Sequence, residues 1–433
     1  MKSLIQPVKG TRDFYPEEMA VRTWLYEIIR KVSESFGYRE YEGPYLESIE
    51  LYSAKSGDEL LKEQSFIFPD RGGNLIALRP ELTPTLARMV AQKQRQLAYP
   101  VRWWSFGPFW RYERPQKGRG REFFQWNIDL FGIASPEADA EMVAIAASLF
   151  REVGLTPEHV KILVNSRRLV ETKLAAMGIP AQLRAEVSRW IDRRAKMAPP
   201  AWEAQASSLG LTEEQISGAK DFLQNYENWK ESDELTRFFA AIEAFGCQDY
   251  VNFDPNIVRG LDYYTGIVFE AVESVGDIRR SILGGGRYDN LLADVGGQPL
   301  PGVGFAMGDM VFTLILEKLD LLPDFTSASP ASILVTVFEA SLLHASFALA
   351  TELRRSGLNV INYPEASKLS RQIKFADRVG VRIVVFLGPD EIKENLLTIK
   401  DLRTGDQFSV SRDKASEAIR LRLMSFSSAA NRV

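Results

Sequence analysis

The sequence of 433 residues has little of two residue types on which much enzyme chemistry depends. It contains one cysteine, Cys247, and two histidines, His159 and His344. A single cysteine cannot form an internal disulfide and is too few for a zinc cluster. Catalytic sites of the Ser-His-Asp or Cys-His type need more of these residues, placed beside their catalytic partners, and so do metal sites with histidine ligands. If the chain is an enzyme, we therefore expect its chemistry to depend on arginines, carboxylates and backbone groups, with an added ion.

Long apolar runs are also missing. Stretches such as residues 142–147 and 383–387 are far shorter than the ~18–20 residues needed to cross a bilayer. Residues 1–15 reach charged side chains at once, so we expect no secretory signal. The composition is 45% hydrophobic and 25% charged, which is typical of a folded, soluble protein and excludes a disordered or collagen-like chain. We expect a cytoplasmic location and no membrane partner.

The charge of the chain is unevenly distributed. The net charge is −4 overall, but residues 333–433 carry +4 and the remainder −8. A basic tail on an acidic body can steer a polyanion to one end of a molecule. The same excess also suits a solvated surface, and both interpretations stay open on charge alone.

The clearest boundary is the stretch 323–332, where two prolines and three serines predict a linker. After it, strand and helix patterns alternate, which predicts a small α/β domain with a largely parallel sheet at residues 333–433. Before it, residues 1–322 mix helical and β-rich runs. Within them, about residues 167–250 are rich in helix formers and contain helix-start patterns such as Thr212-Glu213-Glu214. We interpret this stretch as a helical insertion.

Residues 79–85, Arg-Pro-Glu-Leu-Thr-Pro-Thr, place a carboxylate and a hydroxyl two positions apart, at Glu81 and Thr83. In an extended segment the two side chains share one face. Together they can accept hydrogen bonds from an ammonium group. A turn followed by a helix cap is the alternative.

A basic hairpin is predicted next along the chain. Residues 111–121 hold five Lys and Arg against one acidic residue, with two glycines and a proline, between two β-rich runs. Such a loop can close over phosphates, because arginine presents a planar fork to phosphate oxygens. Glu113 and Gln125 lie on the strand flanks, and Asp129 shares a strand face with Gln125. A merely solvated hairpin is the alternative.

Two further segments suggest a ligand pocket. Residues 258–266 combine Arg259 with two adjacent tyrosines, Tyr263 and Tyr264, which offer stacking surface and hydroxyls. Residues 284–289, Gly-Gly-Gly-Arg-Tyr-Asp, allow the backbone to approach a ligand closely. Ordinary turns would explain both segments equally well. The sequence contains no Walker-type phosphate loop, and no Rossmann glycine motif follows a strand.

Taken in order, these segments resemble the class II histidyl-tRNA synthetases, and the resemblance extends over nearly the whole chain. It includes residues 43–45 in the first motif of that family, which forms its dimer. The other segments that carry it are residues 9–13, 79–83, 111–118, 259–264, 284–289, 374–378 and 400–403.

The resemblance implies an α+β fold. Residues 1–322 would form a class II catalytic domain around an antiparallel sheet, with the helical insertion at about 167–250. Residues 323–332 would be the linker, and residues 333–433 an α/β anticodon-binding domain. A homodimer is implied as well. The implied enzyme is a histidine-specific aminoacyl-tRNA synthetase, a ligase of protein biosynthesis that uses ATP with Mg²⁺. It would form histidyl-adenylate from L-histidine, and then transfer histidine to the 3′ end of tRNA(His).

Residue roles follow from the matching motifs. Arg259 and Arg111 would be the catalytic residues, the first stabilising the pentacoordinate α-phosphate and the second holding the carboxylate and α-phosphate. The residues implied to bind histidine are Glu81, Thr83, Arg111, Gln125, Asp129, Arg259, Tyr263 and Tyr264. Those implied to bind ATP are Arg111, Glu113 and Arg119. Asp129 and a tyrosine hydroxyl could pair with both ring nitrogens. No metal ligands can be identified.

One departure from the family pattern concerns its third motif. There an arginine of a Glu-Arg pair grips the γ-phosphate, whereas this chain has Met310 and Val311. Losing a bidentate charged contact weakens ATP binding by roughly 1.5–3 kcal/mol unless another group substitutes. Arg119, Arg121, Arg287 or an extra metal ion would have to do so, or the chain does not activate amino acids.

Two other functions compete with the synthetase. One is a histidine-sensing regulatory subunit of ATP phosphoribosyltransferase, which has the same fold and no catalytic activity of its own. The loss of the arginine favours it, whereas the basic hairpin, Arg259 and the anticodon-type tail oppose it. The other is a non-catalytic nucleic-acid-binding protein, which would need the tail but not Glu81, Gln125 or Tyr264.

Overall fold

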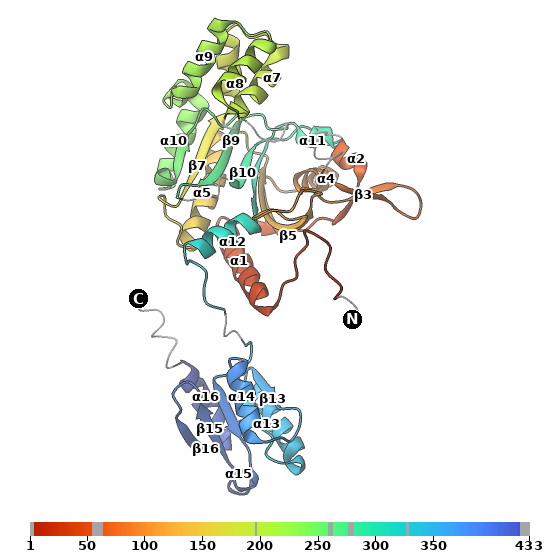
Figure 1. Cartoon of the computed structure of the whole chain (residues 1–433), viewed down its shortest axis with the longest axis vertical. Helices are drawn as coiled ribbons and strands as arrows, with labels where there is room; N and C mark the ends of the chain where they lie inside the picture. The colour runs from red at the N-terminus through yellow and green to blue at the C-terminus, as the bar shows by residue number, and fades with distance from the viewer. Residues whose placement is uncertain are drawn as a thin grey trace. The chain divides into compact units, whose positions relative to one another are not determined.

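The computed structural model describes residues 4–53, 64–194, 197–258, 263–275, 281–325 and 329–424. The chain folds into two compact units (Figure 1). One unit comprises Met1–Tyr15 and Val21–Leu322, and the other comprises Pro16–Ala20 and Pro323–Val433.

The first unit is built on an eight-stranded sheet, counted over the described residues, in the order β1-β5-β6-β11-β10-β9-β7-β8. Only the edge strands β1 and β8 pair in parallel, so the predicted antiparallel sheet is confirmed. The strands are β1 Arg39–Glu40, β5 Val101–Trp110, β6 Glu122–Phe131, β7 Val160–Ser166, β8 Val251–Phe253, β9 Ile267–Glu273, β10 Ser281–Arg287 and β11 Gly302–Gly308.

The alternation of side chains along β6 divides the sheet into an apolar face and a polar face. Trp126, Ile128 and Leu130 are buried in the main core, together with residues of helices α5 (Pro136–Glu152) and α12 (Asp309–Lys318). Successive side chains of a strand point to opposite faces. The odd-numbered residues of β6 therefore lie on the face away from these helices, where the site is found.

A small sheet and further helices complete this unit. A three-stranded sheet has the order β2-β4-β3, with β2 Leu46–Ser48, β3 Phe66–Pro69 and β4 Leu75–Leu78. Besides α5 and α12, the described helices outside the insertion are α1 Pro16–Ser35, α2 Ile49–Ser53, α4 Thr83–Lys93 and α11 Leu291–Asp294, with the 3₁₀ turn η3 Gln248–Tyr250.

The chain between β7 and β8 is helical, as its composition predicted. Thr212 caps α9 by accepting a hydrogen bond from Gln215 N, which agrees with the helix-start pattern. Trp190 and Trp202 stack at 4.0 Å inside the insertion, and each indole N–H donates to the other residue's carbonyl oxygen. The elements are α6 Arg167–Ala176, α7 Ala181–Asp192, α8 Pro199–Ser208, α9 Glu213–Gln224, η2 Asn228–Glu231 and α10 Asp233–Ala244.

The second unit is a five-stranded sheet in the order β13-β12-β14-β15-β16. The strands are β12 Ile333–Val335, β13 Val360–Asn362, β14 Ile383–Phe386, β15 Leu396–Asp401 and β16 Gln407–Ser411. The helices and 3₁₀ turns are η4 Ala340–Leu342, α13 Leu343–Arg355, α14 Leu369–Arg378, α15 Pro389–Glu394, η5 Arg412–Lys414 and α16 Ala415–Met424.

The expectation of a largely parallel sheet in this unit is wrong for its last two strands. The first three strands pair in parallel, whereas β14, β15 and β16 pair antiparallel. Antiparallel neighbours need only a tight connection. Gly405, with a φ of 81°, supplies the left-handed conformation that lets the chain turn back between β15 and β16.

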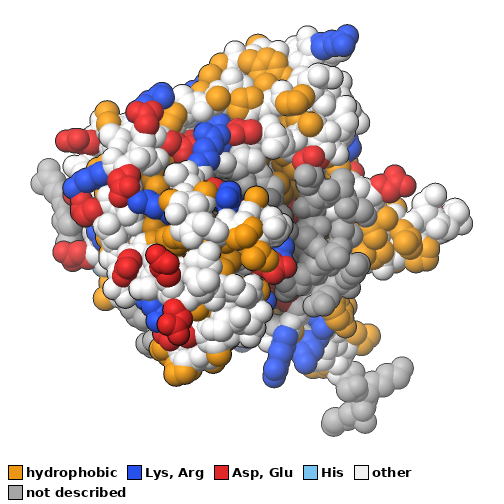
Figure 2. Space-filling model, turned by 90° about the horizontal axis from the view of Figure 1, so that it is seen from above, with side chains coloured by type: hydrophobic (Ala, Val, Ile, Leu, Met, Phe, Trp, Pro, Cys, Tyr) orange, Lys and Arg blue, Asp and Glu red, His pale blue; other side chains and the backbone are white. Residues whose placement is uncertain are grey.

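Basic and acidic side chains are interspersed over the face of the molecule in Figure 2, with apolar patches between them. On this face the acidic excess of the sequence is therefore spread out rather than gathered in one patch. Within the described part of the chain, every helix is too short or too polar to cross a lipid bilayer.

Candidate active site

Two adjoining pockets lie on the polar face of the main sheet. The larger has a volume of about 520 Å³ and the smaller about 60 Å³. They share the lining residues Arg111, Gln125, Tyr264, Gly284 and Ala306. All nine of the predicted site residues that the structure describes line one pocket or both.

Strand β6 supplies the polar side of the smaller pocket through Gln125, Asn127 and Asp129, which alternate onto one face. The neighbouring strand β11 places Gly308, Ala306 and Gly304 directly opposite these three residues. These small residues leave room above the polar side chains. A Cβ on Gly304 would lie 2.2 Å from Oδ1 of Asp129, so the carboxylate can occupy its position only beside glycine.

Asp129 forms the inner end of the smaller pocket. Its side chain is buried, and the hydroxyl of Tyr288 donates a hydrogen bond to Oδ1. Burial raises the pKa of Asp129 to about 7, although the hydrogen bond from Tyr288 lowers it in part. The carboxyl group therefore titrates near neutral pH. A group of this kind in a cleft is typical of functional sites.

Glu81 and Thr83 also line the smaller pocket. The hydroxyl of Tyr263 lies 3.4 Å from Oε2 of Glu81, to which it donates. Thr83 is the first residue of α4, so the segment turns into a helix and is not extended as expected. Both side chains nevertheless line the pocket. Arg79 is fully buried and donates from Nε to the carbonyl of Pro108 at 2.9 Å, which anchors the segment.

Arg111 lies where the two pockets meet. Its Nε donates to the carbonyl oxygen of Pro80 at 2.9 Å, and its guanidinium packs over the ring of Phe123 at 5.4 Å. These contacts hold the cation at the junction. A ligand that extended from one pocket into the other would pass it.

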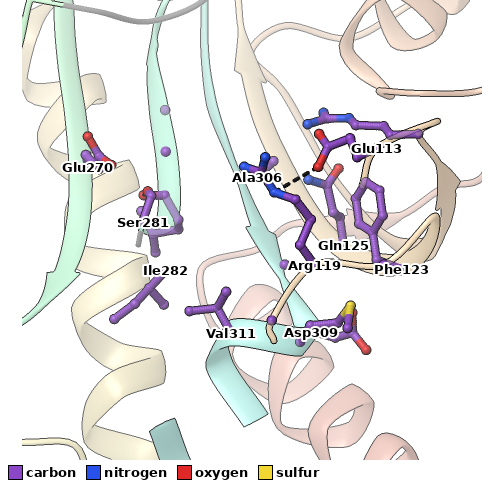
Figure 3. Close-up of a pocket in the computed structure, with 18 of the residues that line it drawn as sticks. Glu113, Arg119, Phe123, Gln125, Glu270, Ser281, Ile282, Ala306, Asp309 and Val311 are labelled. Atoms are coloured by element: carbon purple, nitrogen blue, oxygen red, sulfur yellow. Dashed lines mark hydrogen bonds and ion pairs between the residues drawn. The ribbon is translucent and has the colours of Figure 1, made fainter. Parts of the chain in front are cut away.

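The predicted hairpin is present as β5 and β6, and its basic loop forms one wall of the larger pocket. Arg119 pairs with Glu113, with 2.8 Å between Nε and Oε2 (Figure 3). Glu270, Ser281 and Ile282 lie on the opposite wall in the same view. A pocket between two walls, with a long and flexible arginine side chain on one of them, suits an elongated anionic ligand.

Three arginines were candidates to replace the arginine of the third motif, and the structure separates them. Arg119 lines the larger pocket. Arg121 instead stacks over Tyr112 at 4.1 Å and is not part of the lining. Arg287 is buried in an ion pair with Asp139 at 2.9 Å, away from both pockets. Among the three, Arg119 alone is positioned to meet a ligand in the larger pocket.

The start of α12 closes the base of the larger pocket with Asp309, Met310 and Val311. Asp309 accepts hydrogen bonds from Phe124 N at 2.9 Å and from Arg12 at 2.7 Å. Its carboxylate is therefore engaged in holding the helix start against β6 and the N-terminal segment. Met310 and Val311 present apolar atoms where the third motif has its charged pair.

Arg259, one of the two predicted catalytic residues, lies outside the described residues. The described residues on either side of it reach both pockets, because Ile257 lines the larger and Tyr263 the smaller. Within the described ranges, no group of three or more His, Cys, Asp or Glu side chains could hold a metal ion. An all-protein metal site is therefore not found in them.

The polar residues of these pockets that sequence reasoning missed include Asn127, Tyr288 and Glu270. Asn127 had a signal, because it lies between Gln125 and Asp129 at the strand period of two. Tyr288 follows the glycine run that the sequence singled out. It reaches Asp129 only through the pairing of distant strands.

The family model described as histidyl-tRNA synthetase matches residues 10–309, and the model described as anticodon binding domain matches residues 332–422. The histidine–tRNA ligase of Leptospira biflexa is 35% identical over 423 residues, covering 95% of this chain and 96% of that protein. That of Halobacterium salinarum is 38% identical over 412 residues, covering 92% and 94%.

A solved structure gives the same result. The crystal structure of histidyl-tRNA synthetase from a Nostoc species matches with a TM-score of 0.81 and 26% identity, covering 98% of this chain and 100% of that chain. The match of the family model to well over half of the sequence, together with relatives of this identity along nearly the full length, leads to one conclusion. The chain belongs to the histidyl-tRNA synthetase family.

Proposed function

We propose that this chain is a histidine–tRNA ligase. It activates L-histidine with ATP to histidyl-adenylate and pyrophosphate, and then transfers histidine to the 3′ end of tRNA(His). The observation that carries the proposal is the junction of a small polar pocket and a large one at Arg111. A reaction that joins an amino acid to a nucleotide needs two such pockets meeting at one cation.

Histidine binds in the smaller pocket. Its ammonium group lies between Glu81, Thr83 and Gln125, and its ring extends toward Asp129. Tyr263 and Tyr264 pack around it. The carboxylate then lies beside Arg111 at the mouth of the larger pocket. This orientation matches acceptors to the ammonium group and a cation to the carboxylate, which gives the substrate its direction.

ATP occupies the larger pocket, with Glu113 facing the adenine and Arg119 toward the outer phosphates. An oxygen of the histidine carboxylate attacks the α-phosphorus, and the bond to pyrophosphate breaks. Because the nucleophile belongs to the substrate, the chain needs no catalytic histidine or cysteine. Arg111 and Arg259 stabilise the charge that develops on the α-phosphate.

Mg²⁺ accompanies the phosphates of ATP. It is usually bound by one or two carboxylates together with substrate phosphates, rather than by a cage of protein ligands. Glu270 provides a carboxylate on the wall facing Arg119. We assign Glu270 to the metal. When bound, the ion would neutralise charge on the leaving pyrophosphate.

The second unit binds the anticodon region of tRNA. Its match to the anticodon binding domain and the excess of basic residues in 333–433 support this role. Contacts from Lys and Arg to phosphates supply affinity without sequence information. Discrimination of the anticodon must therefore come from contacts to base edges.

The enzyme works as a homodimer in the cytoplasm. Large apolar side chains are exposed on the small sheet and at the residue before it, where Tyr45, Leu46, Phe68 and Leu75 are each 40–49% exposed. Exposed apolar residues gathered on one element suit a protein interface. The family's dimer-forming motif includes residues 43–45, next to this surface.

A second candidate is the histidine-sensing regulatory subunit. The observation that favours it is the apolar start of α12, where Met310 and Val311 replace the charged pair. Against it stands Arg119, which lines the larger pocket and can contact the outer phosphates. A pure sensor of histidine has no use for that pocket.

The test of the proposal is aminoacylation of unfractionated tRNA with each of the twenty labelled amino acids. We expect charging with histidine alone, dependent on ATP. Charging with another amino acid, or none while histidine still binds, would reject the proposed activity. The second result would favour the regulatory function.

A further inference from the structure

Asn127 has an unusual environment in the smaller pocket. Its side chain is 3% exposed and lines the pocket, yet its Nδ2 has no hydrogen-bond partner among the described residues. An unpaired buried donor typically costs about 1–3 kcal/mol. Asn228 provides a contrast, because it is also 3% exposed but its Nδ2 donates to the carbonyl oxygen of Phe222 at 2.9 Å and so avoids this cost.

The position of Asn127 between Gln125 and Asp129 on β6 indicates what it meets. Gln125 lines both pockets, whereas Asn127 and Asp129 line the smaller one alone, where Tyr288 bonds to Asp129. At the rise of an extended strand, Asn127 is about 7 Å along β6 from each of its two polar neighbours. Ala306 lies directly opposite and leaves the space above the amide open.

Two other polar groups that line the smaller pocket are already engaged with the protein, since the hydroxyl of Tyr288 donates to Asp129 and that of Tyr263 donates to Glu81. The unpaired Nδ2 of Asn127 is a donor available to a ligand, and Tyr264 is the other hydroxyl-bearing residue of this lining. Neutral imidazole carries one N–H donor and one acceptor nitrogen, so a donor beside a carboxylate matches both of its nitrogens.

Resting on the proposed function, we propose that Asn127 is a specificity-determining residue that donates a hydrogen bond from Nδ2 to Nδ1 of the substrate's imidazole, while Asp129 accepts from Nε2–H. With the ammonium group at Glu81, the nearer ring nitrogen, Nδ1, lies beside Asn127, and the farther one, Nε2, lies beside Asp129. The pair selects the neutral ring in one tautomer. An analogue without Nδ1 leaves the amide unpaired and is rejected.

The test measures, by calorimetry on the full chain, the binding of histidine and of β-(pyrrol-3-yl)alanine. In this analogue C–H replaces Nδ1 and the far N–H is kept. The main variant is Asn127→Leu, a near-isosteric apolar residue, with Asn127→Ala as a second. We expect wild-type protein to prefer histidine by roughly ten- to a hundredfold. Asn127→Leu loses that preference by weakening histidine binding alone, with the analogue changed less than about threefold.

Thermal unfolding separates this role from a structural one. Because Asn127→Leu removes an unpaired buried donor, its melting temperature should equal or exceed that of the wild-type protein. Asn228→Ala, a control at an equally buried asparagine in the insertion, should leave both affinities unchanged.

Several results would overturn the inference. One is that Asn127→Leu weakens the binding of both ligands equally, and another is that it leaves the preference for histidine unchanged. Loss of the preference in Tyr264→Phe instead would assign the ring contact to that tyrosine. Histidine-dependent exchange of pyrophosphate with ATP is measured in parallel. Absent exchange with intact histidine binding rejects the proposed enzyme but keeps the role of Asn127, whereas absent histidine binding rejects both.

Discussion

Tyr288 donates its hydroxyl hydrogen to Oδ1 of Asp129, and both side chains are buried at the inner end of the smaller pocket. The bond stabilises the ionised carboxylate and so opposes the burial that raises its pKa to about 7. Tyr288 thereby keeps a buried acceptor ionised over part of the neutral range. In the proposed enzyme this acceptor recognises the histidine ring.

The first prediction concerns this bond. Tyr288→Phe should raise the pKa of Asp129 further and weaken histidine binding at pH 7 by roughly tenfold. The affinity is measured by calorimetry. Tyr38→Phe is the matched control, because Tyr38 is equally buried and its hydroxyl donates to Glu141 outside the pockets. An unchanged affinity in Tyr288→Phe would contradict the role of the bond.

The second prediction is the pH dependence of histidine binding. The complex holds an ionised Asp129 and a neutral ring, whereas the free carboxyl has a pKa of about 7 and a free histidine ring about 6.5. Protons must leave both groups on binding at low pH. The dissociation constant should therefore rise as the pH falls below about 7 and level off above it. Binding that weakened between pH 7 and 8 would indicate that the imidazolium form binds instead.

The third prediction concerns the substitute for the missing arginine. Arg119→Ala should raise the KM for ATP roughly five- to twentyfold, because Arg119 lines the larger pocket while Met310 and Val311 carry no charge. The control is Arg114→Ala, which removes the same charge from the same loop at a residue outside the pocket lining. Equal effects of the two variants would show that only the overall charge of the loop matters.

The fourth prediction tests the close approach between β11 and β6. Gly304→Ala places a Cβ 2.2 Å from Oδ1 of Asp129. We expect a loss of about 1–3 kcal/mol in the free energy of unfolding, together with weaker histidine binding. Gly308→Ala on the same strand meets no atom within 4 Å, and its stability should stay within about 0.5 kcal/mol of wild type. Chemical denaturation of both variants measures the difference.

The hairpin and the face of β6 were predictable because both depend on local patterns. Two β-rich runs around a loop of glycine, proline and arginine specify a hairpin, and the period of two places Gln125 and Asp129 on one face. The same period placed Asn127 beside them. The role proposed for it rests on the structure, in which its Nδ2 is buried without a hydrogen-bond partner among the described residues.

Other features depend on contacts that no local pattern contains. Tyr288 and Asp129 are 159 positions apart and meet because β10, β11 and β6 are neighbours in the sheet. Arg287 looked like a candidate for phosphate binding, but its partner Asp139 lies on α5, and their ion pair is buried. Thr83 begins a helix because the chain turns after β4, which a short extended-looking segment did not reveal.

The central claim is that this chain activates histidine although its third motif lacks the arginine. Histidine-dependent exchange of labelled pyrophosphate into ATP measures that step alone, with Arg259→Ala as the inactive control and other amino acids as the panel. We predict exchange with histidine only, and its loss in the control. Absence of exchange from wild-type protein that binds histidine would contradict the claim and identify the chain as a sensor of histidine.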